Sequence, residues 1–132
     1  MLEEKLQELI PKKLGIFPKI NGGNDPYFFY KWDFDGKTNQ SILRYWFWDK
    51  KRRFKNKKKA FVNEFATLIE FSLGKGGFDR SDFERICPNT NRDGDCGFAI
   101  FVALLEFLDL ITRTGPGVYS VINIEKLREL II

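Results

Sequence analysis

Two short pairs, each an aspartate followed two residues later by a lysine, have the residue types and spacing that could support catalysis. Asp35 precedes Lys37, and Asp49 precedes Lys51 directly after an apolar stretch. Two carboxylates can hold Mg²⁺ while a lysine helps to activate water, which is the chemistry of metal-assisted hydrolysis. Such sites also need a further strand and helix directly after the second pair, but a basic run and a helical half follow instead. We therefore predict that the protein is not an enzyme.

The chain contains few residues that could bind metals or carry out redox chemistry. It has no histidine and only two cysteines, Cys87 and Cys96, which excludes a four-ligand zinc site within one chain. Residues 89–100 imitate a calcium loop, with Gly94 at the sixth position, but the twelfth is Ile100 where a bidentate glutamate is needed. An Asx-rich turn is expected there. The sequence predicts no metal, no cofactor and reduced thiols, with a disulfide across the turn as the alternative.

Positive charge is concentrated in the first half of the chain. Residues 1–60 hold 15 Lys/Arg against 7 Asp/Glu, a net charge of +8. Residues 61–132 hold 7 against 11, a net charge of −4, and the whole chain carries +4. This asymmetry predicts a polyanion-binding surface on the N-terminal half.

A segment rich in aromatic and basic side chains carries this expectation. It consists of Arg44, Tyr45, Trp46, Phe47, Trp48, Lys50, Lys51, Arg52, Arg53, Lys55, Lys57, Lys58 and Lys59. Rings beside cations form the binding surface of single-stranded nucleic-acid binders, where each stacked base contributes about 1–3 kcal/mol. The cations are expected to bind phosphates, and the four rings of 45–48 to stack on exposed bases. The alternatives are a solvated or nuclear-targeting basic face and a hairpin whose rings pack against helices.

The last three lysines of this segment give a second reason to expect a ligand. Helical spacing of apolar residues predicts a helix from about residue 58, ended by the glycines of 74–77. Lys57, Lys58 and Lys59 would lie at its start, where a cation is unfavourable by about 0.3–1 kcal/mol. Folding alone would not select them.

The first half must position this segment on a helix and a hairpin. Apolar spacing predicts a helix over 2–10, and Pro and Gly residues predict a loop over 11–26. Strands are expected over 27–34 and 42–48, joined by a turn that begins at Asp35 and Gly36. The second strand is aromatic on both faces. One face must pack on the helices, and rings left in water on the other would be available for stacking.

The second half is predicted to be mainly helical. A short helix, capped by Asp79 or by Ser81 with Glu84, ends near Cys87. A third helix is expected over 95–111, where 12 of the 14 residues from Phe98 to Ile111 are apolar, so it should be buried on more than one side. A turn over 112–117, a strand over 118–122 and a last helix over 124–131, capped by Asn123, complete the chain.

This order of elements resembles a winged helix-turn-helix over about residues 58–122. The stretch LLEFLDLITRTGPGVYSV, residues 104–121, looks like the third helix of that superfamily running into its wing, with Arg113–Gly117 at the wing. In such families the third helix enters the major groove of DNA. Here its polar positions are acidic, namely Asp93, Asp95, Glu106 and Asp109, and phosphates would repel them. We therefore expect this helix to be core, with 98–111 as a candidate homodimer seam.

Together these features predict an α+β protein in which an N-terminal helix and an aromatic β-hairpin pack on a winged-helix-like helical domain. The expected parts are residues 1–57 and 58–132, forming one compact unit. We expect an intracellular, non-enzymatic protein that binds nucleic acid, DNA rather than RNA, with single strands slightly favoured. A winged-helix regulator of duplex DNA and a protein-interaction module are the alternatives. No apolar run approaches the ~20 residues of a membrane span, and no N-terminal leader is evident.

Overall fold

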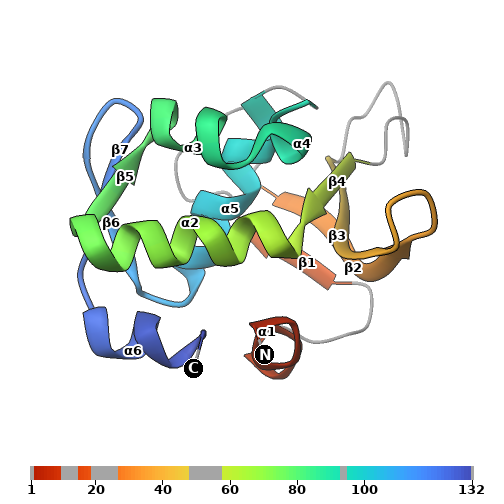
Figure 1. Ribbon diagram of the computed structural model, residues 1–132, viewed down its shortest axis with the longest axis horizontal. Coiled ribbons are helices and arrows are strands. Elements are labelled where there is room, and N and C mark those ends of the chain that lie inside the picture. The colour runs from red at the N-terminus through yellow and green to blue at the C-terminus, as the bar shows by residue number, and fades with distance from the viewer. Residues whose placement is uncertain (1, 10–14, 19–26, 48–57, 93–94, 132) are drawn as a thin grey trace.

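The computed structural model describes residues 2–9, 15–18, 27–47, 58–92 and 95–131 (Figure 1). The first elements are α1 (Leu2–Leu9), β1 (Gly15–Pro18), β2 (Tyr27–Asp35), β3 (Gln40–Phe47) and β4 (Lys58–Phe61). They are followed by α2 (Val62–Lys75), β5 (Gly77–Asp79), α3 (Arg80–Ile86), α4 (Pro88–Asn91), α5 (Asp95–Phe107), β6 (Ile111–Gly115), β7 (Val118–Val121) and α6 (Ile124–Glu129). The strands form two antiparallel sheets, in the orders β1-β2-β3-β4 and β5-β7-β6. The α+β class is thus confirmed.

The two sheets lie at opposite ends of the molecule, and the helices connect them. In Figure 1, α2 crosses the centre, with the β1–β4 sheet on the right and the β5–β7 sheet on the left. Helices α3 and α4 lie along the upper edge, and α1 and α6 lie along the lower edge. The ammonium of Lys5 in α1 donates to the backbone carbonyl of Glu129 in α6, so the first and last helices are bonded to each other.

The expected aromatic hairpin is present as β2 and β3. Its register pairs Phe34 with Ser41 and Asp35 with Gln40, so the turn spans residues 36–39. Asn39 adopts a φ of +57° and donates its backbone N–H to the carbonyl of Asp35 over 2.8 Å. Asparagine tolerates this left-handed conformation, which explains why the turn closes there. The hairpin lies in the middle of a four-stranded sheet, because β1 pairs with β2 and β4 with β3.

Two predictions for the segments that flank the hairpin are wrong. Residues 15–18 form β1 inside the expected loop, and residues 58–61 form β4 rather than the first turn of a helix. Helix α2 begins only at Val62, so Lys58 and Lys59 lie on a strand. Strand β4 belongs to the N-terminal sheet although it follows residue 57, so the expected boundary there does not separate the two sheets.

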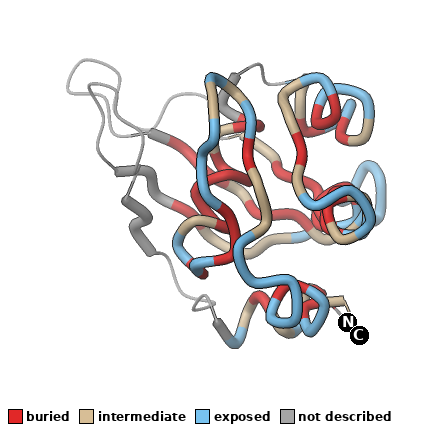
Figure 2. Tube along the Cα trace, turned by 90° about the vertical axis from the view of Figure 1, so that its left-hand side faces the viewer, coloured by how far each residue is buried: buried red, intermediate tan, exposed pale blue. Residues whose placement is uncertain are grey.

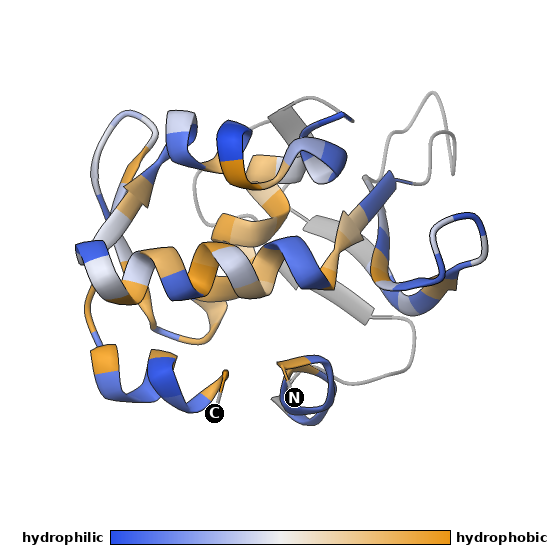
Figure 3. Ribbon diagram, in the orientation of Figure 1, coloured by the Kyte–Doolittle hydropathy of each residue, from blue (hydrophilic) through white to orange (hydrophobic). Residues whose placement is uncertain are grey.

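Helix α5 is the central element of the core, but it is shorter than expected. It ends at Phe107, Asp109 takes a φ of +57°, and Ile111 already belongs to β6. Every residue from Ile100 to Leu105 is buried, because β1, β4, α4 and β6 all pack against the helix. Figure 3 shows α5 as a nearly continuous hydrophobic ribbon, and Figure 2 shows buried residues gathered in the interior, with exposed residues on turns and on the outward sides of helices.

One buried cluster joins both halves of the chain. It includes Leu6 of α1, Tyr45 of β3, Phe65 of α2, Phe101 of α5 and Leu127 of α6. The rings of Phe65 and Phe101 lie 4.4 Å apart between centroids. Two of the expected helix caps involve the residues named for them. The Asp79 side chain accepts from the N–H of Asp82, in a capping box with Asp82 rather than between Ser81 and Glu84, and Asn123 accepts from Lys126.

Candidate nucleic-acid interface

The two faces of the β1–β4 sheet differ in chemistry. Paired residues of neighbouring strands share a face, and alternate residues along a strand point to opposite faces. Tyr30, Leu43, Tyr45 and Ala60 share the inner face and belong to the main core. The opposite, outer face carries a row of three half-buried cations, flanked by the buried side chains of Ile42, Trp46 and Phe61.

This outer row consists of Lys31, Arg44 and Lys59. Lys31 of β2 is directly opposite Arg44 of β3, which is directly opposite Lys59 of β4. Strands are spaced about 4.8 Å apart, so the row spans about 10 Å across the sheet. Like charges directly opposite each other destabilise a sheet unless carboxylates on the same face offset them.

Two aspartates of β2 lie on the same face and form ion pairs with the row. Arg44 Nε donates to Asp33 Oδ2 over 2.7 Å, and Lys59 Nζ donates to Asp35 Oδ1 over 2.9 Å. The bond from Arg44 and the backbone N–H of Phe34 lower the pKa of Asp33 below its ordinary value. The hydroxyl of Thr38 and then the ammonium of Lys59 lower the pKa of Asp35 to about 2. Both carboxylates are therefore ionised at neutral pH, and the face carries three positive and two negative charges.

The predicted stacking role is wrong for two of the four rings. Tyr45 is 0% exposed and Trp46 is 4% exposed, so neither offers a ring face to a base. Their side chains alternate between the faces of β3, which means that the sheet is covered on both sides at this point. The side chain of Phe47 and all of Trp48 lie outside the described residues.

The basic run is described only at its end. Lys50, Lys51, Arg52, Arg53, Lys55 and Lys57 lie outside the described residues. Lys58 and Lys59 are half-buried on β4, so the helix-start argument for a ligand is wrong. Their placement instead brings Lys59 beside Arg44, a proximity that sequence spacing did not indicate. Lys31, the third member of the row, was missed because only the strand register reveals it.

A buried carboxylate positions β4. Glu64 of α2 is 6% exposed and accepts three hydrogen bonds: from the backbone N–H of Asn89 at 3.0 Å, and from the N–H and hydroxyl of Thr90 at 2.8 and 2.7 Å. The hydroxyl of Thr90 in turn accepts the backbone N–H of Phe61 over 3.0 Å. This Glu64–Thr90 network links β4, α2 and α4. No sequence motif indicates it, because Glu64 lies within an otherwise ordinary amphipathic pattern.

The same corner of the fold is closely packed. A Cβ added to Gly97 of α5 would lie 2.5 Å from the carbonyl oxygen of Thr90, so only glycine allows α4 and α5 to approach this closely. Cys87 is buried there with its thiol 3.5 Å from the backbone oxygen of Glu64. Burial, and then the negative charge of Glu64, raise the pKa of the Cys87 thiol. This cysteine is therefore a core residue rather than a nucleophile.

The third helix has the expected burial but no available seam. Within residues 97–111, which are all described, Phe107 and Asp109 are exposed, and Ala99 and Glu106 are half-buried. The remaining residues are buried inside one copy of the chain, so the expected homodimer through Phe98–Ile111 has no continuous apolar face to use. Asp93, and the side chain of Asp95, are not described.

Of the two acid-lysine pairs, only the first is described, because Asp49 and Lys51 lie outside the described residues. Asp35 of the first acid-lysine pair is bonded to Lys59 and Thr38, whereas Lys37 is exposed. In the part of the chain that is described, no three His, Cys, Asp or Glu residues are grouped to hold a metal ion. The helices of that part are also all too short or too polar to cross a bilayer.

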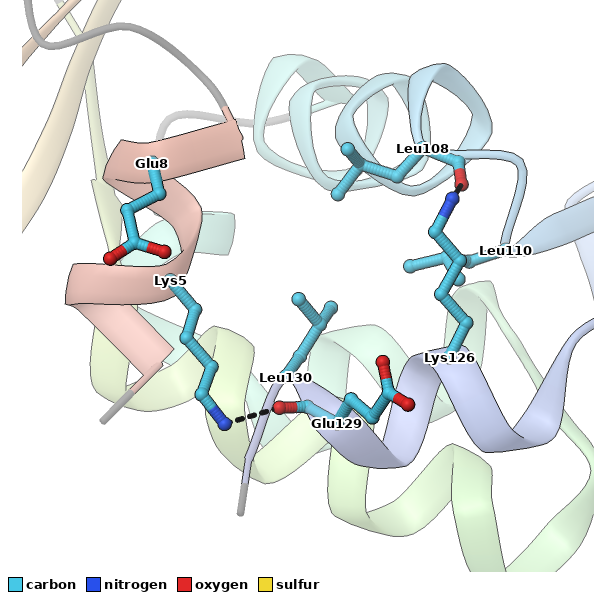
Figure 4. A pocket seen from close by; sticks show the side chains of 7 residues that line it. All are labelled: Lys5, Glu8, Leu108, Leu110, Lys126, Glu129 and Leu130. Carbon is cyan, nitrogen blue, oxygen red and sulfur yellow. Dashed lines mark hydrogen bonds between the residues drawn. The ribbon is translucent and has the colours of Figure 1, made fainter.

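A pocket of about 270 Å³ lies between α1, α6 and the end of α5 (Figure 4). Its lining residues are Lys5, Glu8, Leu108, Leu110, Lys126, Glu129 and Leu130. The Lys126 ammonium donates to the carbonyl of Leu108 over 3.0 Å, and Lys5 bonds the carbonyl of Glu129. Both ammonium groups thus satisfy carbonyls at helix ends, so they stabilise the docking of α1 and α6.

Comparison with protein-family models, with curated proteins and with solved structures finds no match for this chain.

Proposed function

We propose that the protein binds nucleic acid through phosphate contacts on the outer face of the β1–β4 sheet. The observation that carries the proposal is the outer row, in which Lys31, Arg44 and Lys59 are aligned across three strands. In the sequence, the cations of 50–57 lie between Arg44 and Lys59, in the half of the chain with a net charge of +8. Two of the three cations are paired with aspartates, so the row keeps a net charge of +1, to which the cations of 50–57 add, and a polyanion can bind this excess of positive charge.

We further propose that residues 62–121 form a winged-helix-like body that supports this surface. The order α2, β5, α3, α4, α5, β6, β7, with a β5-β7-β6 sheet, supports that likeness, and α4 is a short helix of four residues within it. The burial of α5 argues against the major-groove mode of such proteins, since its side chains cannot reach base edges. Recognition is therefore assigned to the N-terminal sheet.

Single strands remain the favoured ligand, DNA before RNA. Trp48 directly follows β3 and precedes the basic run, which gives one ring beside many cations. Bases of a single strand can stack on such a ring at once, whereas bases of a duplex must first unpair.

The test measures binding of single-stranded and duplex oligonucleotides of equal length by fluorescence anisotropy across a salt series. On single strands, log K should fall with log salt by about 0.7 per phosphate contact. Replacing Lys50, Lys51, Arg52 and Arg53 together by Gln should flatten that slope and weaken binding to every sequence.

The matched control replaces four cations of the second half, Lys75, Arg92, Arg113 and Arg128, by Gln, which removes the same charge. This variant should keep the wild-type slope. If only the control variant loses affinity, and the wild type binds duplex more tightly than single strands, the proposal is replaced by a duplex-binding winged-helix regulator. No binding to either ligand at low salt would refute the proposal and leave a protein-interaction module.

A further inference from the structure

The two ion pairs of the outer face differ in how firmly their carboxylates are held. The side chain of Asp35 is 6% exposed and bonds both Lys59 and the hydroxyl of Thr38, in the turn that closes the hairpin. The side chain of Asp33 is 33% exposed, and Arg44, its partner, is 22% exposed. The Asp35–Lys59 pair is thus built into the turn, whereas the Asp33–Arg44 pair is part-buried and has the more exposed carboxylate of the two.

The position of Asp33 is that of an anion beside the central cation of the row. Arg44 Nε donates to Asp33 Oδ2 over 2.7 Å, and Arg44 lies between Lys31 and Lys59. A guanidinium has five N–H donors in a plane and binds a carboxylate or a phosphate with the same geometry. A phosphate at Arg44 would meet the negative charge of Asp33 at close range.

We propose that Asp33 is an intramolecular competitor of phosphate, which occupies Arg44 in the free protein and is displaced when nucleic acid binds. This inference rests on the proposed function and adds its regulation: the carboxylate weakens binding to isolated anions and short strands. A ligand that also engages Lys31 and Lys59 can displace it, because several phosphates then act together. The low pKa of Asp33 agrees with a carboxylate that remains charged, and so competes, at neutral pH.

The partial exposure of the Asp33–Arg44 pair makes the exchange feasible. Such pairs contribute little because water and salt screen them, whereas each phosphate contact also releases a counterion. Removing the competitor should therefore raise affinity modestly, by about 1.5- to 5-fold at low salt. The gain should shrink as salt rises, because screening weakens the repulsion that it relieves.

The experiment compares wild type, Asp33→Asn, Arg44→Gln and the double variant, using a short single-stranded oligonucleotide at low and high salt. Asp33→Asn should bind more tightly than wild type. The double variant should bind no more tightly than Arg44→Gln alone, since the competitor then has no guanidinium to occupy. Glu84→Gln is the matched control. It changes the net charge equally, at an exposed pair with Arg80 on α3, and should leave affinity unchanged.

The outcomes separate the inference from the function on which it rests. If wild type and all variants fail to bind, the proposed function is wrong. If wild type binds but Asp33→Asn binds equally, or its gain persists with Arg44→Gln, or Glu84→Gln gives the same gain, the competitor role is overturned. Urea unfolding of all variants establishes that they are folded if their free energies of unfolding lie within about 0.5 kcal/mol of the wild-type value, the usual range for surface changes.

Discussion

Removal of the buried carboxylate of Glu64 should destabilise the protein far more than an equivalent change on the same helix. Glu64→Ala deletes the acceptor of three hydrogen bonds, two of them from Thr90, which is 0% exposed. The N–H of Asn89 can turn to water, but the N–H of Thr90 remains buried without an acceptor, at about 1–3 kcal/mol. With the lost charge-assisted bond to the hydroxyl, the expected loss in free energy of unfolding is about 2–5 kcal/mol.

Two further substitutions separate the contribution of the bonds from Thr90 from that of the bond from Asn89 and from a general effect of changing α2. Glu64→Gln keeps one carbonyl oxygen for both bonds from Thr90 and loses mainly the bond from Asn89, so it should cost about 1–2 kcal/mol. Glu70→Ala, at an exposed position of α2, should change stability by no more than about 0.5 kcal/mol. Both changes to alanine gain the same helix propensity, which therefore cancels in the comparison.

The assay is urea unfolding at neutral pH, followed by circular dichroism, with the m-value compared across the series. A constant m-value shows that only stability has changed. A loss below 1 kcal/mol for Glu64→Ala, or an equal loss for Glu70→Ala, would refute the assignment of this network as the link between β4, α2 and α4.

Three further predictions concern packing, acid stability and thiol chemistry. Gly97→Ala should destabilise the protein by about 1–3 kcal/mol, because its Cβ would lie 2.5 Å from a backbone oxygen. Gly74→Ala in α2, where a Cβ would have nothing within 4 Å, should stabilise it by about 0.5–1 kcal/mol. Changes of the same sign in the free energy of unfolding, measured with urea, would contradict this prediction. The pKa of Asp35 is lowered from 3.8 to about 2, so its stabilisation is complete above pH 3.8 and lost as pH falls through 2. The difference in urea midpoint between wild type and Asp35→Asn should therefore be larger at pH 6 than at pH 2, and an equal difference would exclude this carboxylate as the cause. Cys87 should resist alkylation in the native protein and react after unfolding, as mapped by mass spectrometry; native labelling at the rate of a free thiol would show that it is not buried.

The elements predicted correctly are those whose signal is local. The hairpin follows from alternation along β2 and from a turn that begins at Asp35, and the cap of α6 follows from Asn123 alone. Strands β1 and β4 exist because the hairpin has two open edges to pair, which is a property of the sheet and not of residues 15–18 or 58–61.

The end of α5 escaped prediction for a different reason. Leu108, Leu110 and Ile111 continue the apolar run past the last helical turn, so hydrophobic spacing contains no stop. The helix ends at a left-handed Asp109, and neither glycine nor proline marks the position.

The sequence predicts the positive charge of the candidate site but not which side chains lie together in it. The sequence indicates a basic first half, and Arg44 and Lys59 were both named from it. Which cations share a face, and which aspartates lie between them, depends on the register of three strands. The sequence required one face of the second strand to be covered and left the other to solvent, whereas Tyr45 and Trp46, on opposite faces of β3, are both buried.

The single core that joins both halves has a consequence for synthesis in the cell. A hairpin such as β2–β3 closes in about 1–10 μs, but α5, the second of the two helices that cover its inner face, ends 60 residues further along the chain. At about 5–20 residues per second, that distance takes a ribosome about 3–12 s. During this interval Tyr30, Leu43 and Tyr45 face water on a nascent chain. The yield of folded protein should accordingly depend on growth temperature and chaperone supply more than on the stability of the finished molecule.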